Sequence, residues 1–331
     1  MTPLPVHEIL LGGSAAIRKV RALVERVAPT DLPVLIAGPT GSGKELVAQA
    51  IHAASGRAGR LVSFNVCAIA ETMFEDAIFG HVRGAFTGAL NSAPGFLREA
   101  HGGTAFLDEI GGLSASAQAK LLRAIETREF RPVGASTDVR SDFRLIAAAN
   151  EDIWSLEQAG RFRADLAHRL SAFVIRVPPL REHAEDIPLL ALAFLREMGA
   201  DSDVFIGKDA IHLLTRYEWP GNVRELRHVV RSAMTLGGNG QLRADDIRET
   251  LSWRARPSSP PPQRSHADRR LVEVLEQCGW DTDEAARQLN VHRTTVYRRM
   301  KRVGAEKNVL DTARADDLRV QATAFEEPQS A

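Results

Sequence analysis

The chain of 331 residues contains little cysteine and no excess of either charge. Its two cysteines, Cys67 and Cys278, lie far apart in the sequence. They cannot form the disulfide framework of a small secreted domain, so they fit free thiols in a reducing compartment, with a single bridge as the open alternative. The 42 basic and 42 acidic residues balance, so a nucleic-acid partner would have to bind to a local basic cluster.

Long apolar runs are also missing. No stretch is long enough to cross a bilayer, and residues 1–7 lack the charged start and apolar core of a secretion signal. We therefore expect a cytoplasmic protein without a membrane span. The composition, 44% hydrophobic and 25% charged, is that of an ordinary globular protein, and the length allows two or three domains with a sizeable core.

A glycine-rich turn is the strongest motif that is present. Residues 33–37 predict a buried strand and residues 45–51 a helix, and between them lies Gly38-Pro39-Thr40-Gly41-Ser42-Gly43-Lys44. Small residues in such a turn let backbone N–H groups point at an anion, and Lys44 adds a mobile positive charge for the β- and γ-phosphates. Glu45 stands where Ser or Thr usually offers a hydroxyl to Mg²⁺, so the metal ligand is expected elsewhere.

Two later apolar runs end in polar side chains. Residues 104–107 predict a buried strand that ends in Asp108 and Glu109, and such carboxylates lie beside the phosphates in a nucleotide-binding sheet. We expect Asp108 to hold Mg²⁺, directly or through water, and Glu109 to polarise the attacking water. Asn150 ends the strand predicted over residues 143–149 and either senses the γ-phosphate or the water, or caps the next helix.

A predicted helical segment over residues 161–170 carries Arg163 and Arg169. A long cationic side chain can neutralise charge on a transferring phosphoryl group, often from a neighbouring subunit. Surface arginines are common, however, so this pattern alone favours an ordinary surface role.

The region from residue 187 to about residue 251 is mostly helical in pattern and is interrupted by Trp219-Pro220-Gly221-Asn222. This break closes one helix and opens another, which places Arg224 in a first helical turn. The region therefore predicts a small helical lid.

The run Gly84-Ala85-Phe86-Thr87-Gly88-Ala89 sets one aromatic side chain between small, flexible residues. Such a run can present Phe86 on a mobile tip, although glycine-bounded aromatics are also found folded back onto a protein. The pattern alone is weak evidence for a contact site.

The C-terminal part contains the expected basic cluster. Residues 253–268, with four prolines, predict an extended linker, and three short helices follow. Residues 287–302 hold six Lys or Arg and no acid, and they include a short helix, a tight turn and a basic helix. This layout is typical of a helix-turn-helix that contacts double-stranded DNA, and the expected DNA-binding residues are Arg293, Thr294, Thr295, Arg298, Arg299 and Arg302.

From Leu11 to Val303 the chain resembles the bacterial enhancer-binding proteins, the AAA+ activators of sigma-54 RNA polymerase. Residues 84–89 match the family's sigma-54-contacting loop letter for letter. The resemblance implies an α/β AAA+ P-loop NTPase with a parallel sheet and flanking helices, then a lid, a linker and an all-α Fis-type helix-turn-helix domain. The implied limits are 7–180, 181–251, 252–267 and 268–303, and a disordered tail is expected over 304–331.

The resemblance also implies roles for single residues. Glu45 is usual in the family after the P-loop lysine, Asp108 and Glu109 match the Walker B pair, and Asn65 matches the asparagine that restrains the catalytic glutamate. Arg163 and Arg169 match paired arginine fingers acting in trans, and Arg224 matches the sensor II arginine. The chain departs from the family pattern at Pro39, Thr40, Val66, Arg98, Pro132 and Ala149.

The resemblance implies an ATPase that uses Mg²⁺, forms a hexameric ring and binds upstream enhancer DNA through dimerised helix-turn-helix units. Only about ten residues precede the ATPase region, so we expect a separate regulatory protein to act in trans. Two rivals are a DNA-binding repressor with a decayed ATPase and an AAA+ remodeller of another clade. The intact P-loop and acidic pair argue against the first rival, and the loop over residues 84–89 argues against the second.

Overall fold

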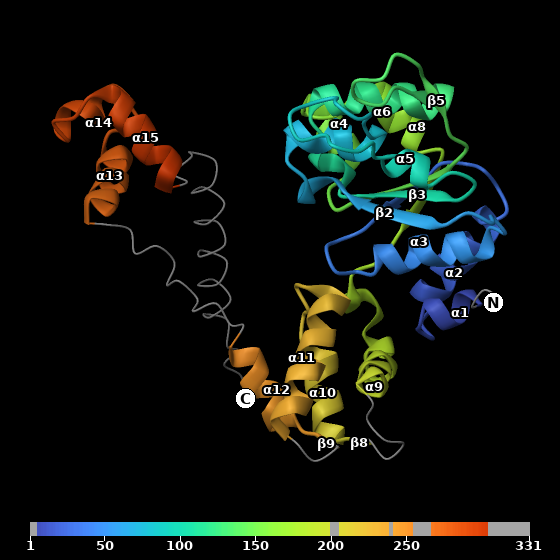
Figure 1. Ribbon diagram of the computed structural model, residues 1–331. Helices are drawn as coiled ribbons and strands as arrows, with labels where there is room; N and C mark the ends of the chain where they lie inside the picture. The colour runs from blue at the N-terminus through green and yellow to red at the C-terminus, as the bar shows by residue number, and fades with distance from the viewer. Residues whose placement is uncertain (1–4, 199–204, 238–240, 254–265, 304–331) are drawn as a thin grey trace. The chain divides into compact units, whose positions relative to one another are not determined.

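The computed structural model describes residues 5–198, 205–237, 241–253 and 266–303. These residues fall into two compact units, Met1–Arg254 and Ala255–Ala331, which are treated separately below (Figure 1). Most of the linker expected over residues 252–267, and the whole of the tail expected over 304–331, lie outside the described residues.

The first unit is built on a five-stranded parallel sheet with the strand order β2-β3-β6-β1-β7. Strands predicted from apolar runs form where expected, whereas β7 was not predicted. The five strands are β1 (Val34–Ala37), β2 (Leu61–Asn65), β3 (Thr104–Asp108), β6 (Arg144–Ala149) and β7 (Phe173–Arg176).

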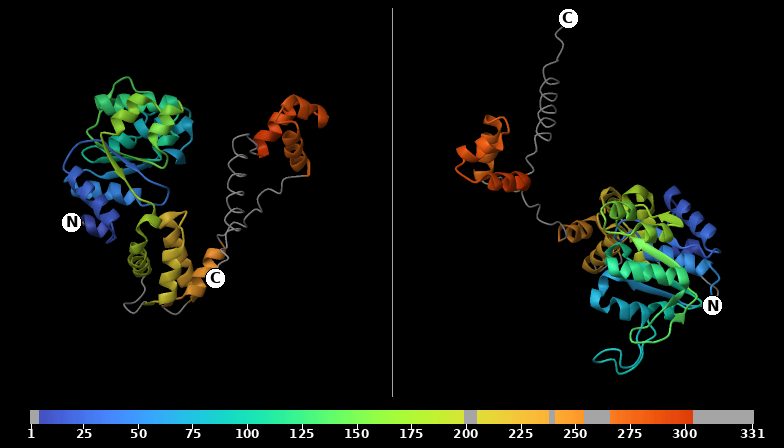
Figure 2. Two further views of the ribbon diagram at one scale, coloured as in Figure 1. Left: turned by 180° about the vertical axis from the view of Figure 1, so that it is seen from behind. Right: turned by 90° about the horizontal axis from the view of Figure 1, so that it is seen from above.

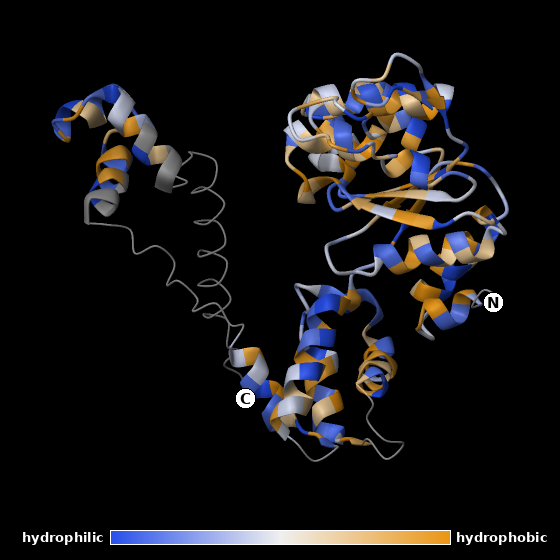
Figure 3. Ribbon diagram, in the orientation of Figure 1, coloured by the Kyte–Doolittle hydropathy of each residue, from blue (hydrophilic) through white to orange (hydrophobic). Residues whose placement is uncertain are grey.

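Helices cover both faces of this sheet (Figure 1). Alternate residues of a strand point to opposite faces, so Leu107 packs into one core cluster and its neighbour Phe106 into the other. The central strands are apolar on both faces, which Figure 3 shows as orange ribbon between the helices. One cluster includes α1 (Val6–Ile9), α2 (Ala15–Val27) and α3 (Lys44–Ala54); the other includes α4 (Glu71–Phe79), α5 (Phe96–Glu99), α6 (Ala115–Thr127), α7 (Ile153–Gln158) and α8 (Ala164–Leu170).

Short elements connect the larger ones. An antiparallel pair, β4 (Glu129–Phe130) and β5 (Val139–Arg140), lies between α6 and β6. Single 3₁₀ turns follow β2 and β3 as η1 (Val66–Ala68) and η2 (Ile110–Gly112), and η3 (Leu180–Asp186) leads into the lid.

One predicted helix begins later than expected. The helical segment predicted over residues 161–170 starts only at Ala164, and Arg163 is its N-cap residue. The buried Gln118 explains the difference, because its amide donates to the Arg161 carbonyl at 3.0 Å and accepts from the Arg163 N–H at 2.8 Å. These contacts hold the residues before α8 in a loop.

The predicted helical lid is present and has its own core around Trp219, which is 1% exposed. Its helices are α9 (Ile187–Glu197), α10 (Lys208–Arg216), α11 (Asn222–Gly237) and α12 (Ala244–Ser252). A short parallel pair, β8 (Phe205–Ile206) and β9 (Gln241–Leu242), was not predicted from the sequence. Arg224 lies in the first turn of α11, as predicted.

The second unit is a three-helix bundle of α13 (His266–Gln277), α14 (Thr282–Gln288) and α15 (Arg293–Val303). Its small core consists of Leu271, Leu275, Ala285, Ala286 and Val296. Among the described residues, no helix is both long and apolar enough to span a membrane.

Candidate functional site

The glycine-rich turn between β1 and α3 has no room for larger side chains at its centre. Gly41 has a φ of +78°, and a Cβ atom there would lie 2.4 Å from the carbonyl oxygen of Gly221 in the lid. The turn therefore takes its shape from glycine, and its backbone N–H groups lie at the start of α3, where the helix dipole favours an anion.

Lys44 lies folded over this turn. Its ammonium donates to the carbonyl oxygens of Gly38 at 2.9 Å and Pro39 at 3.2 Å, and to the Oδ1 atom of Asn150. Burial lowers the pKa of Lys44, the negative charges of Asp108 and Glu109 act in the opposite direction, and the positive charge of Arg224 adds to the lowering. A buried cation among carbonyl groups can exchange these partners for phosphate oxygens.

The residues of the turn fit a phosphate group. The Ser42 hydroxyl is buried and has no hydrogen-bond partner among the described residues, and such a group normally has one in a folded protein. A cavity of about 480 Å³ adjoins the turn and is lined in part by Gly38, Pro39 and Asn150. The unpaired hydroxyl, the glycine backbone and Lys44 together make a site for a polyphosphate.

The acidic pair lies at the carboxyl end of β3, as predicted. Asp108 accepts a hydrogen bond from the Glu109 N–H at 2.9 Å. Glu109 has a left-handed backbone with a φ of +57°, which is uncommon for a residue other than glycine and turns the chain out of the strand. Among the described residues, no group of three or more Asp, Glu, His or Cys side chains could hold a metal ion.

Asn150 joins the two halves of the pocket. Its amide donates to the Oε1 atom of Glu109 at 3.2 Å, while its oxygen accepts from Lys44. Asn150 follows β6, and β6 pairs with both β1 and β3, so the strand order brings it between the lysine and the acid. The alternative role as a helix cap is not seen, because Asp152 is the N-cap residue of α7.

Asn65 makes different contacts from Asn150. It lies opposite Asp108 in the pairing of β2 with β3. Its side-chain oxygen accepts from the N–H groups of Cys67 at 2.9 Å and Ala68 at 3.2 Å, which caps the turn η1. Asn65 is thus close to the acidic pair, and its role toward Glu109 stays a prediction.

The lid closes over the P-loop through contacts that sequence reasoning did not identify. Asn222 donates through its amide to the Thr40 carbonyl at 3.0 Å and accepts from the Leu180 N–H at 2.9 Å. The Arg224 N–H donates to the Gly41 carbonyl at 3.2 Å. Asn222 has a φ of +52°, and the sequence marked it only as part of a helix break.

Arg163 and Arg169 make no hydrogen bond or ion pair with the described residues of this pocket. Arg163 forms an ion pair with Asp165 at 2.8 Å, and this contact raises the pKa of the exposed Arg163 guanidinium. Among the described residues, no hydrogen bond or ion pair joins either arginine to Lys44 or Glu109. Both residues are exposed on the surface of the unit.

The loop over residues 84–89 projects from the first unit, and Figure 2 shows it after α4 in the right-hand view. Gly84 and Gly88 have φ angles of +81° and +104°, and the Gly84 N–H donates to the Ala89 carbonyl at 2.9 Å. Phe86 is 42% exposed, and its ring lies 5.0 Å from that of His81, edge to face. The tip therefore presents Phe86 to solvent and also rests on the base of the loop. Thr87 is exposed and Ala85 partly buried.

The second unit has the predicted turn between two helices. Arg293 and Thr294 are exposed at the start of α15, and Arg293 pairs with Asp283 at 3.2 Å and lies 5.6 Å from the ring of Tyr297. Thr295 and Arg299 are partly exposed. Arg298 and Arg302 belong to α15, but their side chains lie outside the described residues.

These features define a class of protein: a P-loop nucleoside triphosphatase with a parallel sheet and a helical lid, joined to a helix-turn-helix unit. Residues 10–176 match the family described as the sigma-54 interaction domain. Residues 181–264 match the AAA+ ATPase lid domain, and residues 268–302 match the Fis family of bacterial regulatory proteins.

Known proteins agree with this assignment. The chain is 42% identical to the transcriptional regulatory protein ZraR of Escherichia coli strain K12, over 88% of this chain and 68% of ZraR. It is 40% identical to the Nif-specific regulatory protein of Azotobacter vinelandii, over 86% of this chain and 57% of that protein. The crystal structure of NtrX from Brucella abortus in complex with ATP is similar, with 33% identity, a TM-score of 0.66, and coverage of 89% of this chain and 69% of NtrX.

The chain belongs to the family of sigma-54-dependent transcriptional activators. The predicted AAA+ fold with its lid and Fis-type helix-turn-helix domain is confirmed. The two rivals, a repressor with a decayed ATPase and a remodeller of another clade, do not fit this family or the intact pocket. The roles predicted for single residues and the exact domain limits stay predictions.

Proposed function

We propose that the chain hydrolyses ATP at the P-loop and uses the free energy to open promoter complexes of sigma-54 RNA polymerase. The observation that carries this proposal is the meeting of Lys44, Asn150 and Glu109 at one end of the sheet. Lys44 and the backbone of the turn would bind the phosphates, and Glu109 would polarise the attacking water. Asn150 would position the Glu109 carboxylate, and Asn65 would restrain it in another nucleotide state. The proposed nucleotide-binding residues are Gly38, Pro39, Thr40, Gly41, Ser42, Gly43, Lys44, Glu45 and Arg224.

Asp108 would hold the Mg²⁺ ion. Mg²⁺ keeps several of its waters and uses one or two carboxylates together with substrate phosphates, so a single aspartate beside the P-loop is an adequate donor. Bound there, the ion would neutralise charge on the phosphate oxygens. The Glu109 N–H already holds one Asp108 oxygen at 2.9 Å, which orients the carboxylate.

Arg163 and Arg169 would act on the ATP of a neighbouring protomer in a ring, which we take to be a hexamer. Their exposure supports a role in trans. A cation supplied by a neighbour can raise the rate of phosphoryl transfer by roughly 10³-fold or more. The hydrolysis rate would then depend on assembly.

The mechanical output would be at the loop of residues 84–89, where Phe86 and Thr87 are exposed and would push on sigma-54. The remaining loop residues, Gly84, Ala85, Gly88 and Ala89, shape the tip. Dimerised second units would bind upstream double-stranded DNA and raise the local concentration of the ring near the promoter. Because that DNA lies in the bacterial cytoplasm, the protein would act there.

Two variants test the proposal together. Glu109→Gln should bind ATP like the wild type, with hydrolysis reduced by about 10² or more, because the amide cannot polarise water. Thr87→Ala should hydrolyse ATP normally and form no open complex. Nucleotide binding, phosphate release and promoter melting should be measured on both variants; normal melting by Thr87→Ala would refute the loop assignment, and normal hydrolysis by Glu109→Gln the pocket.

A further inference from the structure

His81 lies where the projecting loop leaves the body of the first unit, and backbone hydrogen bonds at His81 and Val82 hold the chain there on two sides. The His81 N–H donates to the Ala93 carbonyl at 3.0 Å, and the Ala93 N–H donates back to the His81 carbonyl at 3.0 Å. On the other side, Val82 donates to the Val133 carbonyl at 3.1 Å. These bonds join the two arms of the loop to each other, and join the outgoing arm to the segment after β4.

The imidazole of His81 bridges the two arms of the loop. Its Nδ1 atom lies 2.5 Å from the Oδ1 atom of Asp76 on α4, and its Nε2 atom lies 2.9 Å from the carbonyl oxygen of Asn91 on the returning arm. A carboxylate and a carbonyl both accept hydrogen bonds, so a ring with a hydrogen on each nitrogen satisfies both contacts, whereas a neutral ring satisfies one. The side chains of His81 and Asp76 are only 14% and 21% exposed, which shields the bond between them from water, whereas the bond to the Asn91 carbonyl is exposed.

The same ring is the surface on which Phe86 rests. The two ring centroids are 5.0 Å apart at an interplanar angle of 65°, which is a favourable edge-to-face arrangement. The glycines on either side of the tip do not pack against the protein, because a Cβ atom at Gly84 or Gly88 would meet nothing within 4 Å. Holding the imidazole therefore holds the aromatic tip.

We propose that His81 is a positioning residue that latches the Phe86 loop: it ties the outgoing arm to α4 through Asp76 and to the returning arm through the Asn91 carbonyl, and it seats Phe86 on its ring. The latch keeps the tip in one orientation until an outside contact draws Phe86 away. This inference deepens the proposed function, because it gives the loop that would contact sigma-54 a defined resting position.

Trypsin measures the latch directly, because Arg83 is exposed between His81 and the tip. Cleavage after Arg83 requires local opening of the loop, so its rate reports how well the arms are held. In the full chain, His81→Phe keeps an aromatic ring and loses both hydrogen bonds, and cleavage after Arg83 should rise at least about tenfold. His81→Asn keeps a donor near the Nδ1 position, so its rate should lie between those of the wild type and His81→Phe.

Cleavage after Arg161, which is exposed in a loop of the same unit, is the internal control and should not change. An unchanged rate after Arg83 in His81→Phe would overturn the latch, and so would a rise matched by an equal rise after Arg161. The measurement contains no sigma-54, so a failure of the latch is distinct from a failure of the proposed function, which Thr87→Ala tests. Steady-state hydrolysis should stay within about twofold of wild type, because His81 contacts no residue of the nucleotide pocket.

Discussion

At the scale of single residues, the proposed pocket depends on one amide. Asn150 contacts Lys44, which lies 106 positions earlier in the chain, and also Glu109, so it connects the phosphate-binding turn to the proposed base. An amide suits this position because it offers an acceptor to the ammonium and a donor to the carboxylate at once.

Asn150→Ala should therefore lower the turnover number for ATP hydrolysis by about 10- to 100-fold, because Glu109 loses the hydrogen bond that orients it. ATP affinity should change much less, because Lys44 and the turn remain. Gln158→Ala, which truncates an exposed amide on the nearby helix α7, is the control and should be neutral. An Asn150→Ala enzyme with normal turnover would contradict this role.

At the scale of elements, a buried carboxylate attaches η3 to the start of α2. Asp186 accepts hydrogen bonds from the N–H groups of Gly13 at 2.5 Å and Ser14 at 2.9 Å, and its second oxygen lies 3.2 Å from His183 Nδ1. Burial acts to raise the pKa of Asp186, but the hydrogen bonds from Ser14 and Gly13 and the nearby His183 outweigh it and lower the pKa below the ordinary value of 3.8. Gly12 is required beside it, because a Cβ atom there would lie 2.8 Å from the carboxylate.

A lowered pKa in the folded state means that Asp186 stabilises the fold at pH values above 3.8, and that this contribution is lost as the pH falls through the lower folded-state value. Asp186→Asn should reduce the free energy of unfolding by about 1–3 kcal/mol at pH 7. Urea unfolding at several pH values should show this difference shrinking below about pH 4. Glu185→Gln, an exposed neighbour, should show no such difference; a gap that does not shrink at all as the pH falls below 4 would contradict the argument.

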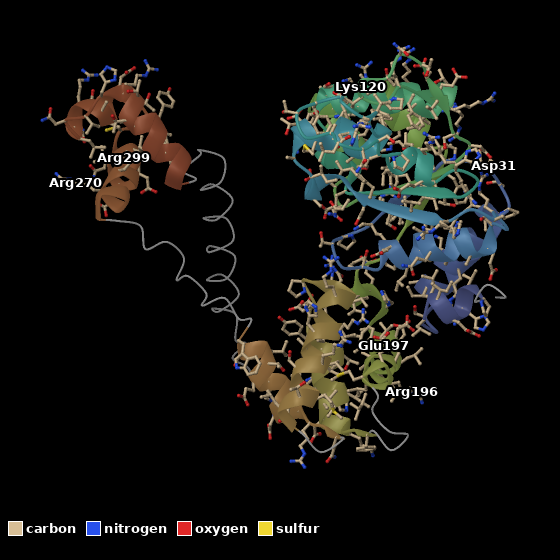
Figure 4. The ribbon with its side chains drawn as sticks, in the orientation of Figure 1. Asp31, Lys120, Arg196, Glu197, Arg270 and Arg299 are labelled. Carbon is tan, nitrogen blue, oxygen red and sulfur yellow. The ribbon has the colours of Figure 1, made fainter. Side chains whose placement is uncertain are left out.

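The basic helix of the second unit carries a prediction of its own. Arg299 lies on α15, the proposed recognition helix, and Arg270 lies on α13 of the same unit (Figure 4). If Arg299 contacts a phosphate, Arg299→Ala should weaken binding to any DNA sequence and flatten the slope of log K against log salt by about one per bound unit. Arg270→Ala should leave the slope unchanged. Equal slopes for the Arg299→Ala chain and the wild type would exclude the phosphate contact.

At the scale of the whole molecule, the exposed Arg163 and Arg169, which make no hydrogen bond or ion pair with the described pocket residues of their own chain, predict shared active sites. A Lys44→Ala chain lacks a working pocket but keeps Arg163 and Arg169, and a chain with both arginines changed to Ala has the opposite defect. Each should be nearly inactive alone, and a mixture should regain ATPase activity at interfaces that pair an intact pocket with intact arginines. No recovery in mixtures that still assemble would mean that the arginines act within one chain.

Much of the fold could be predicted from local pattern, and part of it could not. The apolar runs predicted β1, β3 and β6 because a fully buried strand needs apolar residues on both faces. The edge strand β7, with Arg176 at its end, lacks that pattern and was missed. The start of α8 was placed too early, because a side chain from α6 decides where that helix begins.

The sequence by itself determined the local parts of this protein: the strands, the glycine turn, the acidic strand end, the loop around Phe86 and the basic helix. Each depends on neighbouring residues, whose periodicity and turn chemistry can be read along the chain. Only the tertiary structure decided which distant side chains meet. The bond from Asn222 to the Thr40 carbonyl, 182 positions away, and the bridge of Asn150 between Lys44 and Glu109 follow from strand order and lid packing. Strand order and lid packing depend on the burial of apolar surface from the whole unit rather than on any one segment.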